Sequence, residues 1–125
     1  MVRGKFKLDM FKATVHIYIC EYAECTTNQA NKIIKKFKEA PVTFPIDGLV
    51  FSPDQDRNVN YLFLSIDNLT YNTICHELFH MTDNILEQYS LVEKEDGKET
   101  SANISGYLGE KIFSFLNKKQ IKINN

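Results

Sequence analysis

Five consecutive residues carry the clearest chemical signal in this chain: His76-Glu77-Leu78-Phe79-His80. Apolar residues recur around them at three- and four-residue steps, which predicts a helix that begins at about Thr70 or Asn72 and ends at Tyr89. Residues four apart on a helix share one face and lie about 6 Å apart along its axis. The two imidazoles are therefore placed to share one ion, and Glu77 beside them can act as general base on a water there.

The other interpretation of these histidines is that they are ordinary polar residues on a helix surface. The apolar residues around them predict a buried helix instead, in which neighbouring imidazoles are costly unless an ion satisfies them. Two histidines and a water leave a tetrahedral zinc one protein ligand short. Glu99 is the candidate, because it follows His80 by nineteen positions and opens a helix that can return antiparallel. Its alternative role is a carboxylate that the dipole favours at a helix amino end.

Other polar residues compete for roles near this motif. Asp83 follows His80 by three positions and shares its helical face, so it can ligate the ion, hold an imidazole or stay in solvent. Tyr107, about two helical turns past Glu99, is the candidate hydrogen-bond donor to a tetrahedral intermediate, or else a core or rim tyrosine. His16 is expected to be a structural histidine. Weaker alternative ligands, expected to be surface charges, are Glu87, Glu93 and Glu95.

The remaining pattern predicts an α+β fold of order β-α-β-β-α-α, with a small three-stranded sheet packed on the histidine helix. The predicted elements are strands Thr14–Cys20, Leu49–Ser52 and Tyr61–Ile66, a helix from Thr26 or Thr27 to Lys38, and a last helix from Glu99 to Leu116. Strands Leu49–Ser52 and Tyr61–Ile66 are expected to form a hairpin, and either of them can be the exposed edge that pairs with extended substrate backbone. Small residues on the last helix are expected to let another helix approach closely: Ala102, Gly106 and Gly109.

Composition sets the class of molecule. A chain of 125 residues with 43% hydrophobic residues fits one domain spanning 1–125, with 1–12 and 117–125 as mobile ends. Fifteen basic and sixteen acidic residues give no field that would gather nucleic acid, and no apolar run reaches the roughly 20 residues of a membrane helix. Three cysteines and the lack of a secretion signal favour the cytoplasm. Only 26 residues follow Glu99, too few for a second subdomain. Three interpretations stay open: a peptidase for short or flexible segments, a subunit whose cleft a partner or a second copy completes, and a zinc-stabilised binding protein.

The stretch Thr73–His80, followed by Glu99-Thr100-Ser101-Ala102, resembles the zincin metallopeptidases of the gluzincin type. More narrowly, it is similar to small HExxH proteins encoded by bacteriophages. The likeness is detailed over Thr70–Gly109 and only architectural before it. It implies a minimal zincin-like fold with zinc held by His76, His80 and Glu99, and with Glu77 activating water. The gluzincin Glu-x-x-x-Asp pairing is absent, since position 103 is Asn103.

Together these expectations describe a zinc-dependent metallopeptidase that hydrolyses peptide bonds in a peptide or protein substrate, in the host cytoplasm if the chain is phage-encoded. The alternative is a zinc-stabilised binding protein without catalysis, or a phage structural or accessory protein on the same fold. Glu77 favours the peptidase, because a closed structural zinc site has no need of a general base.

Overall fold

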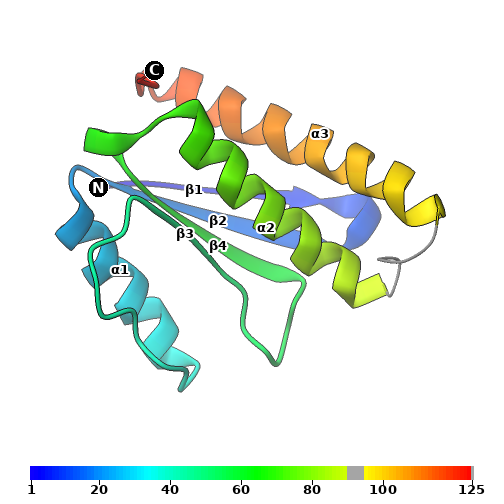
Figure 1. Ribbon diagram of the computed structural model, residues 1–125, viewed down its shortest axis with the longest axis horizontal. Coiled ribbons are helices and arrows are strands. Elements are labelled where there is room, and N and C mark those ends of the chain that lie inside the picture. The colour runs from blue at the N-terminus through cyan, green and yellow to red at the C-terminus, as the bar shows by residue number, and fades with distance from the viewer. Residues whose placement is uncertain (90–94, 125) are drawn as a thin grey trace.

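A four-stranded sheet lies between two layers of helices (Figure 1). The computed structural model describes residues 1–89 and 95–124. In chain order the elements are β1 (Val2–Leu8), a 3-10 turn (Asp9–Phe11), β2 (Ala13–Cys20), α1 (Ala23–Lys36), β3 (Gly48–Phe51), β4 (Val59–Ser65), a second 3-10 turn (Ile66–Asn68), α2 (Tyr71–Tyr89) and α3 (Glu95–Lys118). Helix α1 covers one face of the sheet, and α2 and α3 run side by side over the other. The predicted α+β class is confirmed.

The strand order across the sheet is β1-β2-β4-β3. Strands β2 and β4 are parallel, and the other two pairs are antiparallel. Parallel neighbours need a crossover connection, which α1 and β3 provide between β2 and β4. Strand β4 is therefore an inner strand, and β3 is the edge strand beside α2. Of the two strands that the sequence left open as the exposed edge, the structure selects the one at Leu49–Ser52.

The prediction of a three-stranded sheet is wrong because β1 was missed. The segment 1–12, expected to be a mobile end, instead pairs antiparallel with β2 from Val2 opposite Ile19 to Leu8 opposite Ala13. Apolar and basic residues alternate along it, and the apolar ones face the core. This period of two is the signature of a half-buried strand. Gly4 lets the ring of Phe115 lie against it, since a Cβ there would stand 2.3 Å from that ring.

Helix α1 begins three residues before the predicted cap at Thr26. Tyr22 precedes its first turn, and Thr26 is buried inside it. The Thr26 hydroxyl lies 3.0 Å from the carbonyl of Tyr22 and 2.6 Å from the hydroxyl of Ser65 on β4. A threonine can satisfy its hydroxyl against the preceding turn of its own helix. The polar side chain that resembled a cap therefore fastens α1 to the sheet.

Two apolar clusters lie on the two faces of the sheet. The larger, between the sheet and α2 with α3, is built on Val15, Ile17, Ile19, Leu62, Leu64, Ile74, Met81, Ile85, Ile104, Leu108 and Ile112. The smaller, under α1, contains Ala30, Ile33, Ile34, Ile46, Phe51 and Phe63. Alternate residues of β2 and β4 contribute to opposite faces, as the pleat requires. The larger cluster holds α2 against the sheet and so fixes where the histidines lie.

Helices α2 and α3 pack antiparallel, but not through the predicted stripe of small residues. Ala102 and Gly106 are exposed, and only Gly109 lies near α2, where an added Cβ would be 3.4 Å from Leu78. The hydroxyls of Thr82 and Ser105 lie 3.0 Å apart one turn further along. Buried Ile and Leu side chains of α3 supply the rest of its packing against the core.

The carboxyl-terminal segment also lies against the core rather than apart from it. Ile121 and Ile123 pack on the larger cluster, and the backbone N–H of Asn124 donates to the carbonyl of Leu69 at 2.7 Å. Asn124 also bridges to Thr70, just before α2. The described part of the predicted mobile end 117–125 is thus attached to the start of the histidine helix.

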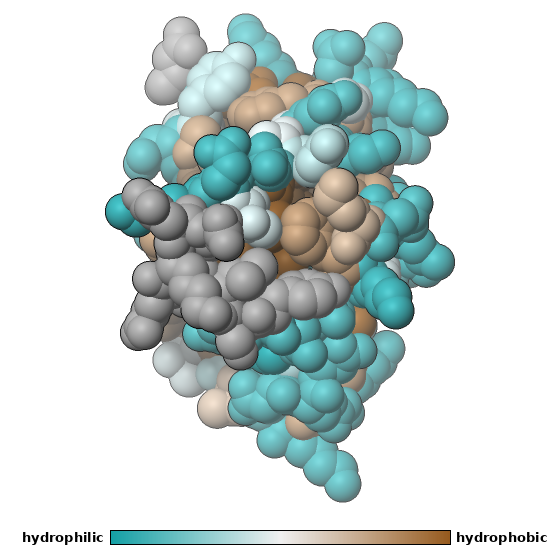
Figure 2. Space-filling view, turned by 90° about the vertical axis from the view of Figure 1, so that its right-hand side faces the viewer, coloured by the Kyte–Doolittle hydropathy of each residue, from teal (hydrophilic) through white to brown (hydrophobic). Residues whose placement is uncertain are grey.

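Among the described residues, none of the helices is both long and apolar enough to cross a membrane. On the face seen in Figure 2, hydrophilic residues make up most of the surface, and hydrophobic residues show between them in small patches.

Candidate metal centre

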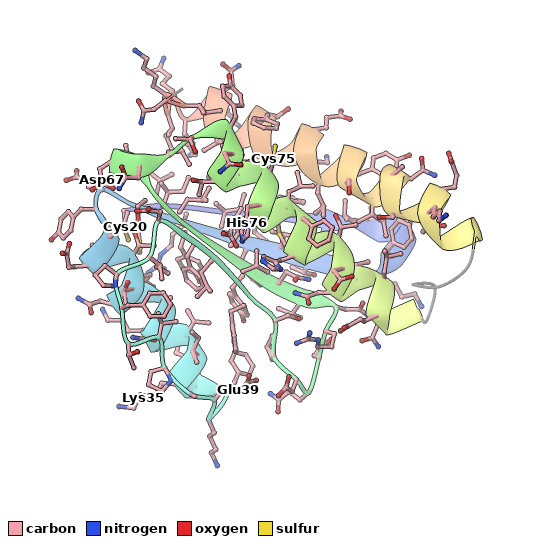
Figure 3. All side chains as sticks on the ribbon, viewed as in Figure 1. Cys20, Lys35, Glu39, Asp67, Cys75 and His76 are labelled. Atoms are coloured by element: carbon pink, nitrogen blue, oxygen red, sulfur yellow. The ribbon has the colours of Figure 1, made fainter. Side chains whose placement is uncertain are left out.

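His76 and His80 present their Nε2 atoms to one another at 3.2 Å. His76 lies on the side of α2 that faces β3 and β4 (Figure 3). At this distance one neutral imidazole can donate a hydrogen bond to the other. Two ligands of a tetrahedral zinc, each about 2.1 Å from the ion, would lie about 3.4 Å apart. The pair therefore stands at the separation that a shared ion requires.

Both histidines are exposed, so their expected burial is wrong. The buried apolar residues of α2 face the sheet and α3, whereas the two imidazoles reach beyond the edge of the sheet into a cleft. Desolvation of the imidazoles is accordingly not a reason for an ion to bind. The argument for an ion rests on the spacing of the donor atoms.

Glu77 completes a group of three candidate ligand atoms, which all lie within 4.8 Å of one another. These three residues are thus close enough to bind a metal ion. Glu77 is only 6% exposed. Burial raises the pKa of its carboxyl above the ordinary value, while both imidazoles and a hydrogen bond from the backbone N–H of Val50 act in the opposite direction. Glu77 is therefore a buried base beside two exposed imidazoles.

The contact between Glu77 and β3 depends on Gly48. A Cβ at Gly48 would lie 2.9 Å from Cγ2 of Thr73 and 3.1 Å from both Cγ and Oε2 of Glu77. A side chain at this position would force the strand and the helix apart. Val50, two residues later, turns its N–H away from β4 toward Glu77. The edge strand thus approaches the histidine helix because glycine occupies its first position.

A cleft runs along β3 on both sides of the three residues. Its larger hollow, about 510 Å³, extends past Ser52 to Arg57 and Asn84, and its smaller one, about 260 Å³, reaches Asp47 and Asn72. His76, Glu77, Ile46, Gly48 and Phe44 border both hollows. Phe44, at the rim, is 65% exposed, and Phe79, beside His80, is 68% exposed. The candidate donors thus lie where an extended chain placed along β3 would pass.

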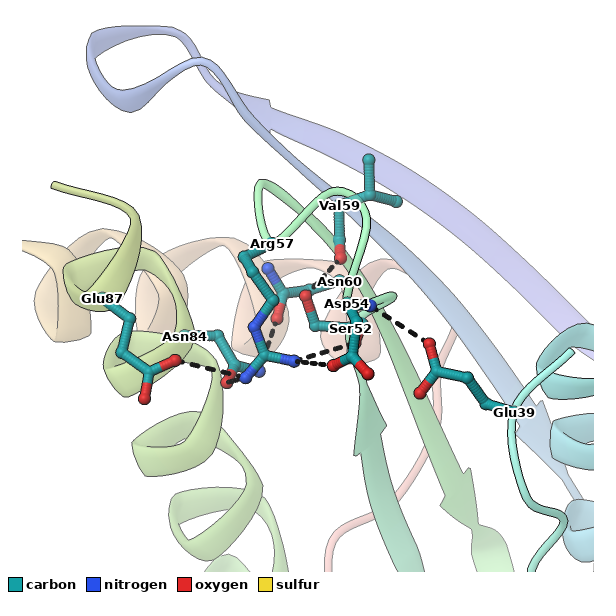
Figure 4. A network of polar contacts seen from close by, with 8 residues as sticks. All are labelled: Glu39, Ser52, Asp54, Arg57, Val59, Asn60, Asn84 and Glu87. Carbon is teal, nitrogen blue, oxygen red and sulfur yellow. Dashed lines mark hydrogen bonds and ion pairs between the residues drawn. The ribbon is translucent and has the colours of Figure 1, made fainter. Parts of the chain in front are cut away.

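Arg57 closes the far end of the larger hollow (Figure 4). It comes from the turn between β3 and β4, and its guanidinium donates to the carbonyl of Ser52 at 3.0 Å and to Oδ1 of Asn84 at 3.1 Å. Glu87 on α2 and Asp54 in the turn pair with it at 3.3 and 3.5 Å. This network joins the end of β3 to α2 across the cleft.

The structure does not bring Glu99 to the group, contrary to the spacing argument. Helix α3 packs on the Leu78 side of α2, whereas the histidines face β3. The contacts of Leu78 with Gly109 and of Thr82 with Ser105 set Glu99 level with Gln88, about 12 Å along the axis from His80. Glu99 is exposed there. Because α3 begins at Glu95 rather than at Glu99, its antiparallel return starts nearer the end of α2 than expected.

The other predicted site residues also lie apart from the donors. Asp83 is half-buried and lies outside the group of ligand atoms. Tyr107 faces a separate hollow near Met10 and Phe11, between α3 and the turn after β1. Glu87 pairs with Arg57. Glu93 lies outside the described residues, as does the side chain of Glu95.

His16 lies on the opposite face of the sheet, where its ring stacks on Tyr61 at 4.9 Å. Burial, with a smaller effect of Lys5, lowers the pKa of His16. This environment agrees with the structural role expected from the sequence.

Sequence reasoning missed several residues around the cleft, chiefly Gly48, Val50, Arg57 and Asn84. Asn84 was within reach, because it follows His80 by one helical turn and so shares its face. The partners of Gly48 and Arg57 on α2 lie 25 or more positions away in the sequence. No local pattern marks such contacts.

Comparison with models of known protein families, with curated proteins and with solved structures finds no match to this chain.

Proposed function

We propose that the protein is a zinc-dependent metallopeptidase in which His76 and His80 hold the ion and Glu77 is the general base. One observation carries the proposal: the two Nε2 atoms stand 3.2 Å apart beside a buried carboxylate, at the edge strand of the sheet. The resemblance to gluzincins agrees with it but leaves the third ligand open, since Glu99 lies away from the group.

Zinc suits this donor set because neutral imidazole is among its preferred ligands. Both imidazoles are exposed and so accessible from the cleft. When bound, zinc supplies polarisation of the scissile carbonyl and lowers the pKa of an attacking water. Among the described residues, the group close enough to hold an ion is His76, Glu77 and His80, and Glu77 serves as the base. We therefore assign the remaining coordination positions to water, substrate or a partner chain.

Glu77 supplies the proton transfer. A carboxyl whose pKa is raised by burial lies nearer to neutral pH than a free one, which suits a base that must first accept a proton and later release it. Glu77 would take the proton of the attacking water and give it to the departing amine. The hydrogen bond from Val50 fixes the orientation of the carboxylate for both transfers.

The substrate would lie as an extended peptide along the outer side of β3. Strand β3 is the edge strand of the sheet, and an exposed strand edge can pair with an added strand. The cleft continues on both sides of Glu77, which allows residues before and after the scissile bond to be bound. These features favour peptide over small-molecule substrates.

The test is cleavage of a mixed peptide library by zinc-loaded protein. Glu77→Gln keeps the size of the side chain but removes the base, so we expect cleavage to fall by about 100-fold or more. Glu110→Gln is the matched control, because Glu110 is an exposed residue of α3. It should leave the rate unchanged.

Equal cleavage by wild type and Glu77→Gln would contradict the assigned base. If neither protein cleaves while both bind zinc, the chain is a zinc-stabilised binding protein, and the peptidase proposal fails.

A further inference from the structure

We propose that Arg57 is a positioning residue of the cleft, which holds the turn after β3 against α2 and so fixes the width of the cleft beside His80. Its role in substrate binding rests on the proposed peptidase function, whereas its role in positioning β3 does not.

The guanidinium of Arg57 makes hydrogen bonds on both sides of the cleft. On the strand side, Nη1 donates to the carbonyl of Ser52 at 3.0 Å. On the helix side, Nη2 donates to Oδ1 of Asn84 at 3.1 Å and to Oε2 of Glu87 at 3.3 Å. The side chain is 31% exposed. A planar group that is bound in two directions fixes both separation and orientation.

Two of the three residues that accept hydrogen bonds from Arg57, Ser52 and Asn84, are close in the chain to the site residues. Ser52 follows Val50, the donor to Glu77, by two residues, and Asn84 follows His80 by one helical turn. At the other end of β3, Gly48 touches α2 directly. Strand and helix therefore meet without a bridge at Gly48, and through Arg57 at the end where the larger hollow lies.

Asn84 is also hydrogen-bonded to a buried residue of the sheet. Its Nδ2 donates to Oδ1 of Asn60, a fully buried residue of β4, at 3.1 Å. By contrast, the carboxylates of Asp54 and Glu87 are 86% and 52% exposed. Ion pairs between solvent-exposed side chains contribute little to the free energy of folding. The hydrogen bonds to Ser52 and Asn84 therefore carry the positioning.

Amide hydrogen exchange measured by NMR tests the placement of β3 without any substrate. Loss of the hydrogen bonds to Ser52 and Asn84 in Arg57→Gln should speed exchange of the Val50 amide by about tenfold, with amides of α1 and α3 within about twofold of wild type. Arg57→Lys keeps the positive charge but not the planar guanidinium that donates in two directions. Its exchange rate at Val50 should lie between those of wild type and Arg57→Gln. The matched control is Arg3→Gln at the opposite edge of the sheet, where Arg3 stands 5.5 Å over the ring of Tyr18. It should leave Val50 unchanged.

Unchanged exchange at Val50 in Arg57→Gln would overturn the proposal. So would an equal rise in every element, which would mark Arg57 as a residue of general stability only.

Peptide cleavage then measures how the loss of Arg57 affects substrate binding. Because Arg57 is outside the group of candidate ligand atoms, Arg57→Gln should raise KM by about tenfold with kcat within about twofold. A fall in kcat at unchanged KM would contradict a role in cleft width. If wild type cleaves no peptide, the peptidase proposal fails, and the exchange of Val50 still decides whether Arg57 positions β3.

Discussion

Glu77 is the residue at which the histidine helix meets the edge strand. Its neighbours His76 and His80 could be identified from the sequence, because a four-residue spacing on a helix is a local property. The contacts that bury Glu77 could not be, because Gly48 and Val50 precede it by more than 25 residues and reach it only through the packing of α2 on the sheet. The sequence thus predicted the donors but not the strand beside them.

Substitution of Gly48 tests whether β3 and α2 are in close contact at this position. In Gly48→Ala the new methyl group would meet Thr73 at 2.9 Å and Glu77 at 3.1 Å. We expect the free energy of unfolding to fall by about 1–3 kcal/mol, the usual effect of overpacking. Chemical denaturation followed by circular dichroism measures it.

Gly106→Ala is the control, because nothing lies within 4 Å of a Cβ at Gly106, on the exposed side of α3. It should raise the free energy of unfolding by about 0.5–1 kcal/mol, since alanine favours the helix. A Gly48→Ala protein as stable as wild type would show that β3 and α2 are not in close contact.

At the scale of elements, periodicity located β2, β4 and α2 to within two residues of their observed bounds. It failed where two signals conflicted. The alternation from Val2 to Leu8 is clear, but its charges resembled a solvated terminus. The polar tail hid Ile121 and Ile123, whose spacing of two places both against the core. The structure of both terminal segments therefore depends on contacts with residues far away in the sequence, which the local pattern does not reveal.

Ile123→Ala tests whether the tail supports α2. Ile123 is partly buried beside the backbone contact of Asn124 with Leu69, just ahead of the helix. Loss of its packing should lower the free energy of unfolding by about 1–2 kcal/mol, less than for a fully buried isoleucine. Lys122→Ala, between the two isoleucines and exposed, should change it by less than about 0.5 kcal/mol. Equal unfolding curves for both variants and wild type would show that the tail does not contribute.

At the scale of the whole molecule, the site lies at one edge of the sheet and not between two subdomains. The small number of residues after Glu99 left open whether a partner walls the cleft, and that stays a prediction. The segment before β3 borders the cleft through Glu39, Phe44 and Ile46. Helix α3, which was expected to supply the third ligand, covers the other side of α2. The order of the elements after β1 could be predicted from the sequence. The sides of α2 on which β3 and α3 pack could not.

Zinc titration by calorimetry tests whether His76 and His80 share one ion. We expect about one zinc per chain in wild type and a loss of affinity of about 100-fold or more in His80→Ala, which removes one of two imidazole ligands. His16→Gln, at the third histidine of the chain, should bind zinc as wild type does, because His16 stacks on Tyr61 across the sheet. Wild-type zinc affinity in His80→Ala would show that the two histidines do not share an ion.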